Sequence, residues 1–258
     1  MHNTTINFAK KLAPLNFENI LLVVLGLLAA GIVKGATGIG YATCALPILA
    51  SVVGLKAAMA LILAPTFATN FSMAVFSGDL RNVIGRFYPL YLGMIPGIAV
   101  GVLLLASIDA KAAVCLLGVL LMIYAVLSLT KPALRLSPDA ARHLRIPVGL
   151  TTGLLTGLTG SQVIPLVPYM LSLGIDPKLS IQAINLGVLI LTTALSGALF
   201  ASSLVDVGLL QMSVLSMVPA LAGVAIGTAI QTRLSAPFLR RLVVSVVGLI
   251  GMKMALGF

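Results

Sequence analysis

The sequence predicts an all-α fold: a polytopic transmembrane helical bundle of two inverted repeats, each a re-entrant or broken helical hairpin plus three transmembrane helices. Three observations support this. Hydrophobic residues make up 60 % of the 258 residues and charged residues only 9 %, against about 25 % in soluble domains. Long apolar runs fill most of the chain. A Gly- and Thr-rich segment recurs before and after a basic connector, and internal repeats of this kind dictate architecture.

The apolar runs have the length and composition of membrane helices. A spanning helix needs ~20 mainly apolar residues, the mean hydropathy is +1.16, and the alternation typical of strands is absent. No separate soluble domain is expected. The runs cover residues 18–54, 56–77, 83–106, 109–129, 146–173, 177–201, 207–230 and 237–256.

Four parts are expected along the chain: an N-terminal tail (1–17), a first transmembrane repeat (18–129), a basic connector (130–145) and a second repeat (146–258). Because more membrane segments follow the first run, we interpret that run as a retained helix and not as a cleaved signal. The formal net charge is +10, but the basic residues sit in short loops, where they set membrane orientation. Nucleic acid is therefore not an expected partner.

The repeat is visible in two short segments with matching downstream prolines. Gly35–Gly38 (GATG) is followed by Pro47, and Gly157–Gly160 (GLTG) is followed by Pro168, with corresponding positions about 120 residues apart. Transporters built from such repeats commonly bind substrate at the repeat interface.

The first run of each repeat is predicted to be interrupted, at Lys34–Gly40 and at Thr156–Gln162, because glycine is the poorest helix former after proline. The resulting pieces have about 13–19 residues, which is short for a span. Either each run crosses the membrane once as a broken helix, or it is a re-entrant hairpin that returns to its own side.

The distribution of arginine favours the hairpins. With crossing runs, the basic residues divide between both sides. With hairpins, every arginine lies on one side, and the other side holds only Lys10, Lys11, Lys56, Lys111 and Lys253. The positive-inside rule makes the arginine-rich side cytoplasmic, which places both termini on the opposite side.

The interruptions are the predicted substrate site. Irregular backbone at membrane depth persists only where protein or a water-filled cavity satisfies it, and the N-terminus of the following helix favours an anion. The alternative is that the Gly and Thr residues only allow close helix packing. The predicted substrate-binding residues are Lys34, Gly35, Thr37, Gly38, Gly40, Thr156, Gly157, Thr159, Gly160, Ser161, Gln162 and Asn185.

Lys34 is the one strong charge inside an apolar run, and ionisable residues in membranes are costly and often functional. The alternative is a lysine that extends to the interface. Thr156 occupies the corresponding place in the second repeat, so the predicted site is asymmetric. Asn70 and Asn185 are polar residues in corresponding apolar runs, and they either line the path or hydrogen-bond between helices.

Several chemistries are disfavoured by what the apolar runs lack. All six acidic residues lie near run ends, and the two histidines lie in the tail and the connector. A proton relay of the usual kind, a cation or metal carrier, and a hydrolase using Ser161 without a histidine are therefore not expected. Cys44 and Cys115 are interpreted as core residues. We expect no catalytic residue, no metal and no cofactor, and a carrier or pore for an anion or a neutral solute.

The pattern resembles the sulfite exporter TauE/SafE family, also called the toluene-sulfonate uptake permease family. The resemblance rests on Gly31–Gly40 with Pro47, and on Gly153–Gly160 with Pro165 and Pro168, and its layout covers essentially the whole chain. Ala36-Thr37 and Ser161-Gln162 depart from the more glycine-rich family pattern, which bears on substrate identity. The resemblance implies transport of sulfur-containing anions such as sulfite, sulfonates or sulfoacetate.

We therefore expect a secondary transporter that moves a small anion, sulfur-containing like the family's substrates, by alternating access. Its partners would be the anionic substrate and the lipid bilayer of a bacterial cytoplasmic (inner) membrane, and a homodimer is compatible with the sequence. The alternatives are a passive anion channel and a membrane scaffold without transport.

Overall fold

The structure is a computed structural model that describes residues 16–76, 78, 80–130, 135–231 and 236–257. All regular elements in these ranges are helices, which confirms the predicted all-α class. The predicted N-terminal tail lies almost entirely outside them. Five described helical segments are long and apolar enough to cross a membrane, and a bent pair would make a sixth.

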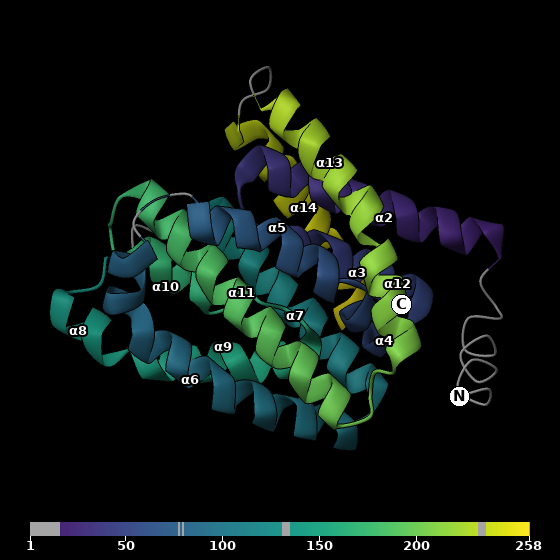
Figure 1. Cartoon of the computed structure of the whole chain (residues 1–258), viewed down its shortest axis with the longest axis horizontal. Helices are drawn as coiled ribbons and strands as arrows, with labels where there is room; N and C mark the ends of the chain where they lie inside the picture. The colour runs from purple at the N-terminus through teal and green to yellow at the C-terminus, as the bar shows by residue number, and fades with distance from the viewer. Residues whose placement is uncertain (1–15, 77, 79, 131–134, 232–235, 258) are drawn as a thin grey trace.

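Six helices precede the connector: α2 (Phe17–Thr37), α3 (Tyr41–Val53), α4 (Leu55–Leu61), α5 (Leu63–Phe76), α6 (Leu80–Ser107) and α7 (Ala110–Thr130). Seven follow the connector or lie within it: α8 (Pro138–His143), α9 (Arg145–Thr159), α10 (Leu166–Ser172), α11 (Pro177–Ala201), α12 (Val207–Leu215), α13 (Met217–Ile230) and α14 (Ala236–Ala255). In Figure 1, α8 and α10 lie at one end of the bundle, and α4 and α12 lie at the opposite end.

Two of the acidic residues at run ends are helix caps. The Asp176 carboxylate accepts hydrogen bonds from the Lys178 and Leu179 N–H groups at the start of α11. The Asp206 carboxylate accepts one from Leu209 N–H at the start of α12. Caps of this kind satisfy the N–H groups that have no partner within the helix, so these carboxylates serve the ends of the bundle and not its interior.

Both predicted interruptions begin later than expected. Helix α2 continues through Lys34 to Thr37, where Gly38 adopts a left-handed φ of 80°, and Gly40 (φ 94°) precedes α3. Helix α9 continues to Thr159, where Gly160 has a φ of 75°. The helices end where the backbone needs a left-handed residue. Lys34 and Thr156 are therefore helical, contrary to the predicted boundaries.

The lengths around the interruptions also differ from the prediction. Helices α3 and α9 have 13 and 15 residues, whereas α10 has only 7. Helix α2 has 21 residues and is long enough to cross a membrane, so the expectation of a short piece is wrong there. The reason is that glycine does not break α2 at position 35, where it serves a helix contact described below.

Each interruption is a turn between two antiparallel helices. A Cβ on Gly26 of α2 would lie 2.8 Å from Ile48 Cγ2 of α3, so α3 folds back along α2. After the second interruption, the Tyr169 hydroxyl of α10 donates to Ala141 O at 2.6 Å. Because Ala141 lies just before α9 begins, α10 returns to the end from which α9 starts.

The predicted run 56–77 is bent by 41° between α4 and α5, and the sequence explains the bend. Pro65 has no N–H group to donate to the carbonyl four residues earlier, which is Leu61 O. The Ser213 hydroxyl of α12 donates to that carbonyl at 3.1 Å and accepts from Ala64 N–H at 2.9 Å. A side chain of another helix thus satisfies the backbone groups that the bend exposes.

Two helix pairs join residues on opposite sides of the connector through glycine. A Cβ on Gly97 of α6 would lie 2.2 Å from Leu150 O of α9, and a Cβ on Gly153 of α9 would lie 2.1 Å from Met94 O. Gly31 of α2 and Gly223 of α13 make the same kind of contact. In both pairs the two helices run parallel, with glycines four residues apart that let the backbones touch.

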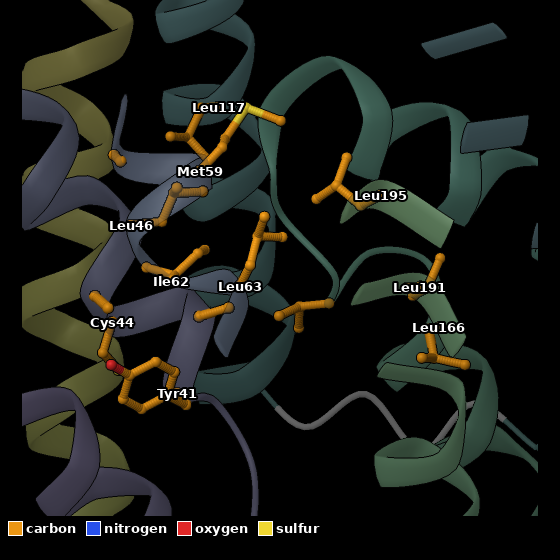
Figure 2. Packing of buried hydrophobic residues seen from close by; sticks show 14 of the residues in the cluster. Tyr41, Cys44, Leu46, Met59, Ile62, Leu63, Leu117, Leu166, Leu191 and Leu195 are labelled. Carbon is orange, nitrogen blue, oxygen red and sulfur yellow. The ribbon is translucent and has the colours of Figure 1, made fainter. Parts of the chain in front are cut away.

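The buried side chains form a continuous cluster across these helices. Figure 2 shows Leu46, Met59, Ile62 and Leu117 on one side of this cluster and Leu166, Leu191 and Leu195 on the other. Large apolar side chains are also exposed along α2, α6 and α13, Leu22, Leu103 and Val218 among them. An apolar outer surface around an apolar core is expected of a protein surrounded by lipid.

Candidate anion-binding site

Lys34 is the centre of the candidate site. It lies in the last turn of α2 with 1 % of its surface exposed, and it is the only charged side chain buried in the described part of the chain. Its Nζ donates a 2.7 Å hydrogen bond to Asn70 Oδ1 of α5 and another to Asn185 Oδ1 of α11. Its burial excludes the alternative of a lysine that extends to the interface.

The two asparagines are themselves held in place. Asn70 Nδ2 donates to Thr66 O at 2.7 Å, and Asn185 Nδ2 donates to Ile181 O at 2.7 Å and to Gly38 O at 3.2 Å. Because each amide nitrogen has a carbonyl partner, each amide oxygen is turned toward Lys34. Asn185 also ties the first interruption to α11.

The lysine has no carboxylate to balance it. None of the acidic residues that the structure describes is buried, and the two groups that contact Nζ are neutral amides. Burying an ammonium group without a counter-charge is strongly unfavourable. An anion bound beside Lys34 would supply the missing charge.

A small cavity of about 20 Å³ adjoins Lys34. The first interruption contributes Ile39, Gly40 and Thr43, and the second contributes Gln162 and Val163. Residues of both interruptions therefore line one cavity.

Three buried polar atoms around this cavity have no hydrogen-bond partner in the described part of the chain: the hydroxyls of Tyr41 and Thr43, and Gln162 Oε1. Gln162 Nε2 donates to Thr192 Oγ1 at 2.9 Å. Helix α3 begins at Tyr41 with no side-chain cap, and its first three residues line the cavity. The cavity therefore combines an ammonium, two hydroxyls and a helix N-terminus, all suited to an anion.

A second, larger cavity of about 280 Å³ adjoins the first. The two share Ile39, Gly40, Thr43 and Ile184 among their lining residues. Most of the other side chains around the larger cavity are aliphatic, and most of these come from α10, from the start of α11 with the turn before it, and from α14. These include Met170, Ile175, Val243, Val244 and Val247.

Several predicted binding residues come together here. Lys34, Gly40 and Gln162 line the small cavity, and Asn185 and Gly38 join it through their hydrogen bonds. Thr37 lines the larger cavity, but its hydroxyl donates to the backbone oxygens of Val33 and Ile39, both at 2.8 Å.

The other predicted residues lie outside both cavity linings. Gly35 faces Val224 O of α13 and Gly157 faces Ile98 O of α6, so both serve helix crossings. The Thr156 hydroxyl donates to Ser161 O and the Thr159 hydroxyl to Leu155 O. Gly160 packs against Leu46 and Met59. The hydrogen bonds of Thr156 and Thr159 shape the turn between α9 and α10.

Asn70 and Thr43 belong to the site but were not among the predicted binding residues. Asn70 had a detectable signal, because it is an amide inside an apolar run. Thr43 had none, since a threonine in a membrane helix usually bonds its own backbone. Only the fold reveals that this hydroxyl is buried without a partner.

Comparison with known proteins gives one match. A family model described as sulfite exporter TauE/SafE matches residues 22–254, which include both interruptions and the connector. No curated protein and no solved structure matches the chain.

Proposed function

Because the chain belongs to the sulfite exporter TauE/SafE family of membrane transporters, we propose that it is a secondary transporter for a small sulfur-containing anion. The anion is a sulfite, sulfonate or sulfoacetate-like compound, and it crosses a bacterial cytoplasmic membrane by alternating access. The observation that carries this proposal is the buried Lys34, whose hydrogen bonds within the described residues go to two neutral amides.

The oxyanion group of the substrate binds beside Lys34. Lys34 Nζ, the Thr43 hydroxyl and the first N–H groups of α3 border one small cavity, and all three can donate to an oxygen that carries negative charge. Gln162 supplies an acceptor there, which suits a bound water or a hydroxyl.

The larger cavity supports an organic sulfonate over bare sulfite. Its volume is about 280 Å³ and its walls are mostly aliphatic, near the lower limit of pockets for small organic ligands at ~300 Å³. A sulfonate with a short carbon chain places its charged group at Lys34 and its carbon chain between Ile184 and Val244. Sulfite alone leaves that apolar space unused.

Alternating access is supported by how the helices pair. Helix α6 packs along α9, and α13 packs along α2, each pair parallel and joined through glycine. In each pair, a helix from the first apolar run of one repeat packs along a helix from the third run of the other repeat. This reciprocity is expected of two repeats that rock against each other around a central site.

The proposal is tested by counterflow in proteoliposomes. Proteoliposomes that contain wild type and are loaded with unlabelled sulfoacetate are expected to accumulate labelled sulfoacetate. Lys34→Met keeps the length of the side chain but removes its charge and its hydrogen-bond donors to Asn70 and Asn185, and it is expected to lose most of this uptake. The control is Lys253→Met, because Lys253 is exposed on α14.

Two outcomes contradict the proposal. Uptake that counter-substrate does not stimulate, together with a measurable unitary conductance, indicates a passive channel. Equal uptake by wild type, both variants and empty liposomes, with no anion that stabilises the protein against heat, indicates a scaffold without transport.

A further inference from the structure

A third cavity lies at the connector, away from Lys34. It occupies about 190 Å³ and is bordered by Arg86 and Phe87 of α6, by the connector and the start of α9, and by Tyr169 of α10. It shares no lining residue with the two cavities beside Lys34. Two arginines border it, and none of the acidic residues that the structure describes does.

The arginines are placed by the fold. The guanidinium of Arg86 lies over the Phe87 ring, 5.5 Å from its centroid, in a cation–π contact. Arg145 is half-buried, and its Nε is fully covered without a hydrogen-bond partner. A buried donor that stays unpaired is destabilising, so an acceptor bound in the cavity would stabilise the structure at this N–H group.

The walls of the cavity are fixed by two hydrogen bonds. The Tyr169 hydroxyl donates to Ala141 O at 2.6 Å, and Leu136 N–H donates to Ser172 O at 3.1 Å. Both bonds hold the connector against α10. The proton of Tyr169 is therefore already used, and Arg145 also lies within hydrogen-bond reach of the Tyr169 side chain. The remaining N–H groups of the two guanidinium groups are the donors available to a ligand.

We propose that this cavity is a second anion site that binds a phosphate-type oxyanion through Arg86 and Arg145. Guanidinium groups match the oxygens of phosphate with pairs of charge-assisted hydrogen bonds. The volume is below the ~300 Å³ of pockets for drug-sized ligands, so it suits a headgroup or a small ion. Basic cavities between membrane helices on the cytoplasmic side are suited to anionic lipid headgroups, and free phosphate offers the same chemistry.

The test compares four full-length proteins: wild type, Arg86→Gln, Arg145→Gln and Arg142→Gln. Arg142 is the matched control, because it is an exposed arginine in α8 of the same connector. Thermal unfolding is measured in detergent with increasing inorganic phosphate. It is also measured in nanodiscs of phosphatidylglycerol and of phosphatidylcholine, which separates a lipid headgroup from a free ion.

We expect phosphate, phosphatidylglycerol or both to raise the unfolding temperature of wild type and of the Arg142 variant equally. For whichever ligand acts, Arg86→Gln and Arg145→Gln should weaken apparent binding about tenfold, since each loses charge-assisted hydrogen bonds. If neither ligand stabilises wild type, or if all three variants respond alike, the proposal is wrong.

A folding defect does not obscure the result. Arg86 is exposed, so its variant is expected to fold even if Arg145→Gln does not, and Arg145→Lys keeps the positive charge at the second position. Lys34 is intact in all of these proteins. An anion bound at Lys34 therefore contributes equally to each, and the outcome is independent of the proposed transport function.

Discussion

Lys34 donates a hydrogen bond to Asn185, 151 residues further along the chain. The bond connects the last turn of α2 with the middle of α11, and Asn185 in turn donates to Gly38 O at the first interruption. One amide therefore contacts both the buried cation and the turn beside it. A change at this amide alters the charge of the site without altering its shape.

The first prediction uses that amide. Asn185→Asp places a carboxylate of nearly the same shape beside Lys34, although it loses the Nδ2 donor to Ile181 O and Gly38 O. This internal counter-ion should exclude an external anion. We expect anion-dependent thermal stabilisation and counterflow to fall at least about tenfold while the protein still folds, because opposite charges at this distance attract strongly in a low-dielectric site. Isothermal titration with sulfoacetate measures the loss.

Asn185→Leu is the companion variant. It removes the hydrogen bonds to Lys34 without adding a negative charge, so it should lower stability by about 1–3 kcal/mol and leave the cation available to the anion. If the Asp and Leu variants bind sulfoacetate equally well, the anion does not bind at Lys34.

The second prediction concerns the larger cavity. Val244 is buried and lines it, whereas Val246 is 47 % exposed on the same helix. Val244→Phe fills part of the cavity and should weaken binding of sulfonates with longer carbon chains more than binding of sulfite, because only the former reach the space beyond Lys34. Competition assays with a series of alkyl sulfonates measure the difference, and Val246→Phe should match wild type. If Val244→Phe lowers the affinity for sulfite and for sulfonates equally, this cavity does not select substrates by chain length.

The third prediction tests the α6–α9 crossing. A Cβ on Gly97 would lie 2.2 Å from Leu150 O, but Gly85 on the same helix has nothing within 4 Å. Gly97→Ala should destabilise the protein by about 1–3 kcal/mol, because the helices must separate. Gly85→Ala should be neutral or stabilise by up to ~1 kcal/mol through helix propensity. Thermal unfolding in detergent gives both values, and similar values for the two variants would contradict the crossing.

The fourth prediction concerns the bend between α4 and α5. Ser213→Ala removes the hydroxyl that pairs with Leu61 O and Ala64 N–H, which leaves two buried backbone groups without partners. We expect a loss of about 1–3 kcal/mol. Ser107→Ala is the control, because that exposed hydroxyl bonds only its own helix at Leu103 O, and its effect should stay within about 0.5 kcal/mol. A small effect at Ser213 would mean that water satisfies the bend.

The sequence predicted the helices well because lipid leaves the backbone few choices. Where no water can pair with N–H and C=O groups, long apolar runs must be helical, and the described residues of these runs are mostly helical. The sequence could not locate the bend at Ile62, because it follows from Pro65 together with the hydroxyl of Ser213, which lies 152 residues beyond the Leu61 carbonyl that it pairs with.

The glycines show where sequence reasoning reaches its limit. Gly35 and Gly38 are three residues apart, yet only Gly38 has a left-handed backbone, whereas Gly35 lies against the backbone of α13. Both uses require glycine, one for its φ angle and one for the absence of Cβ. Composition cannot distinguish them, so the predicted interruption began too early.

The residues of the candidate site could be predicted from the sequence to a similar extent. Lys34 was identified because a charge inside an apolar run is costly wherever it lies. Its contacts with Asn70 and Asn185 depend on how α5 and α11 cross, which spacing along one helix does not determine. The second interruption is as rich in Gly and Thr as the first, but the hydroxyls of Thr156 and Thr159 donate to nearby backbone oxygens, Ser161 O and Leu155 O.

The pairing of α2 with α13 has a consequence for biosynthesis. Gly31 contacts Gly223, which lies 192 residues further along the chain. As the chain emerges from the ribosome, the glycine face of α2 enters the membrane long before its partner has been translated. Contacts so distant in sequence form late, and the nascent protein must hold α2 without α13, against lipid or an insertion factor, until that helix has been made.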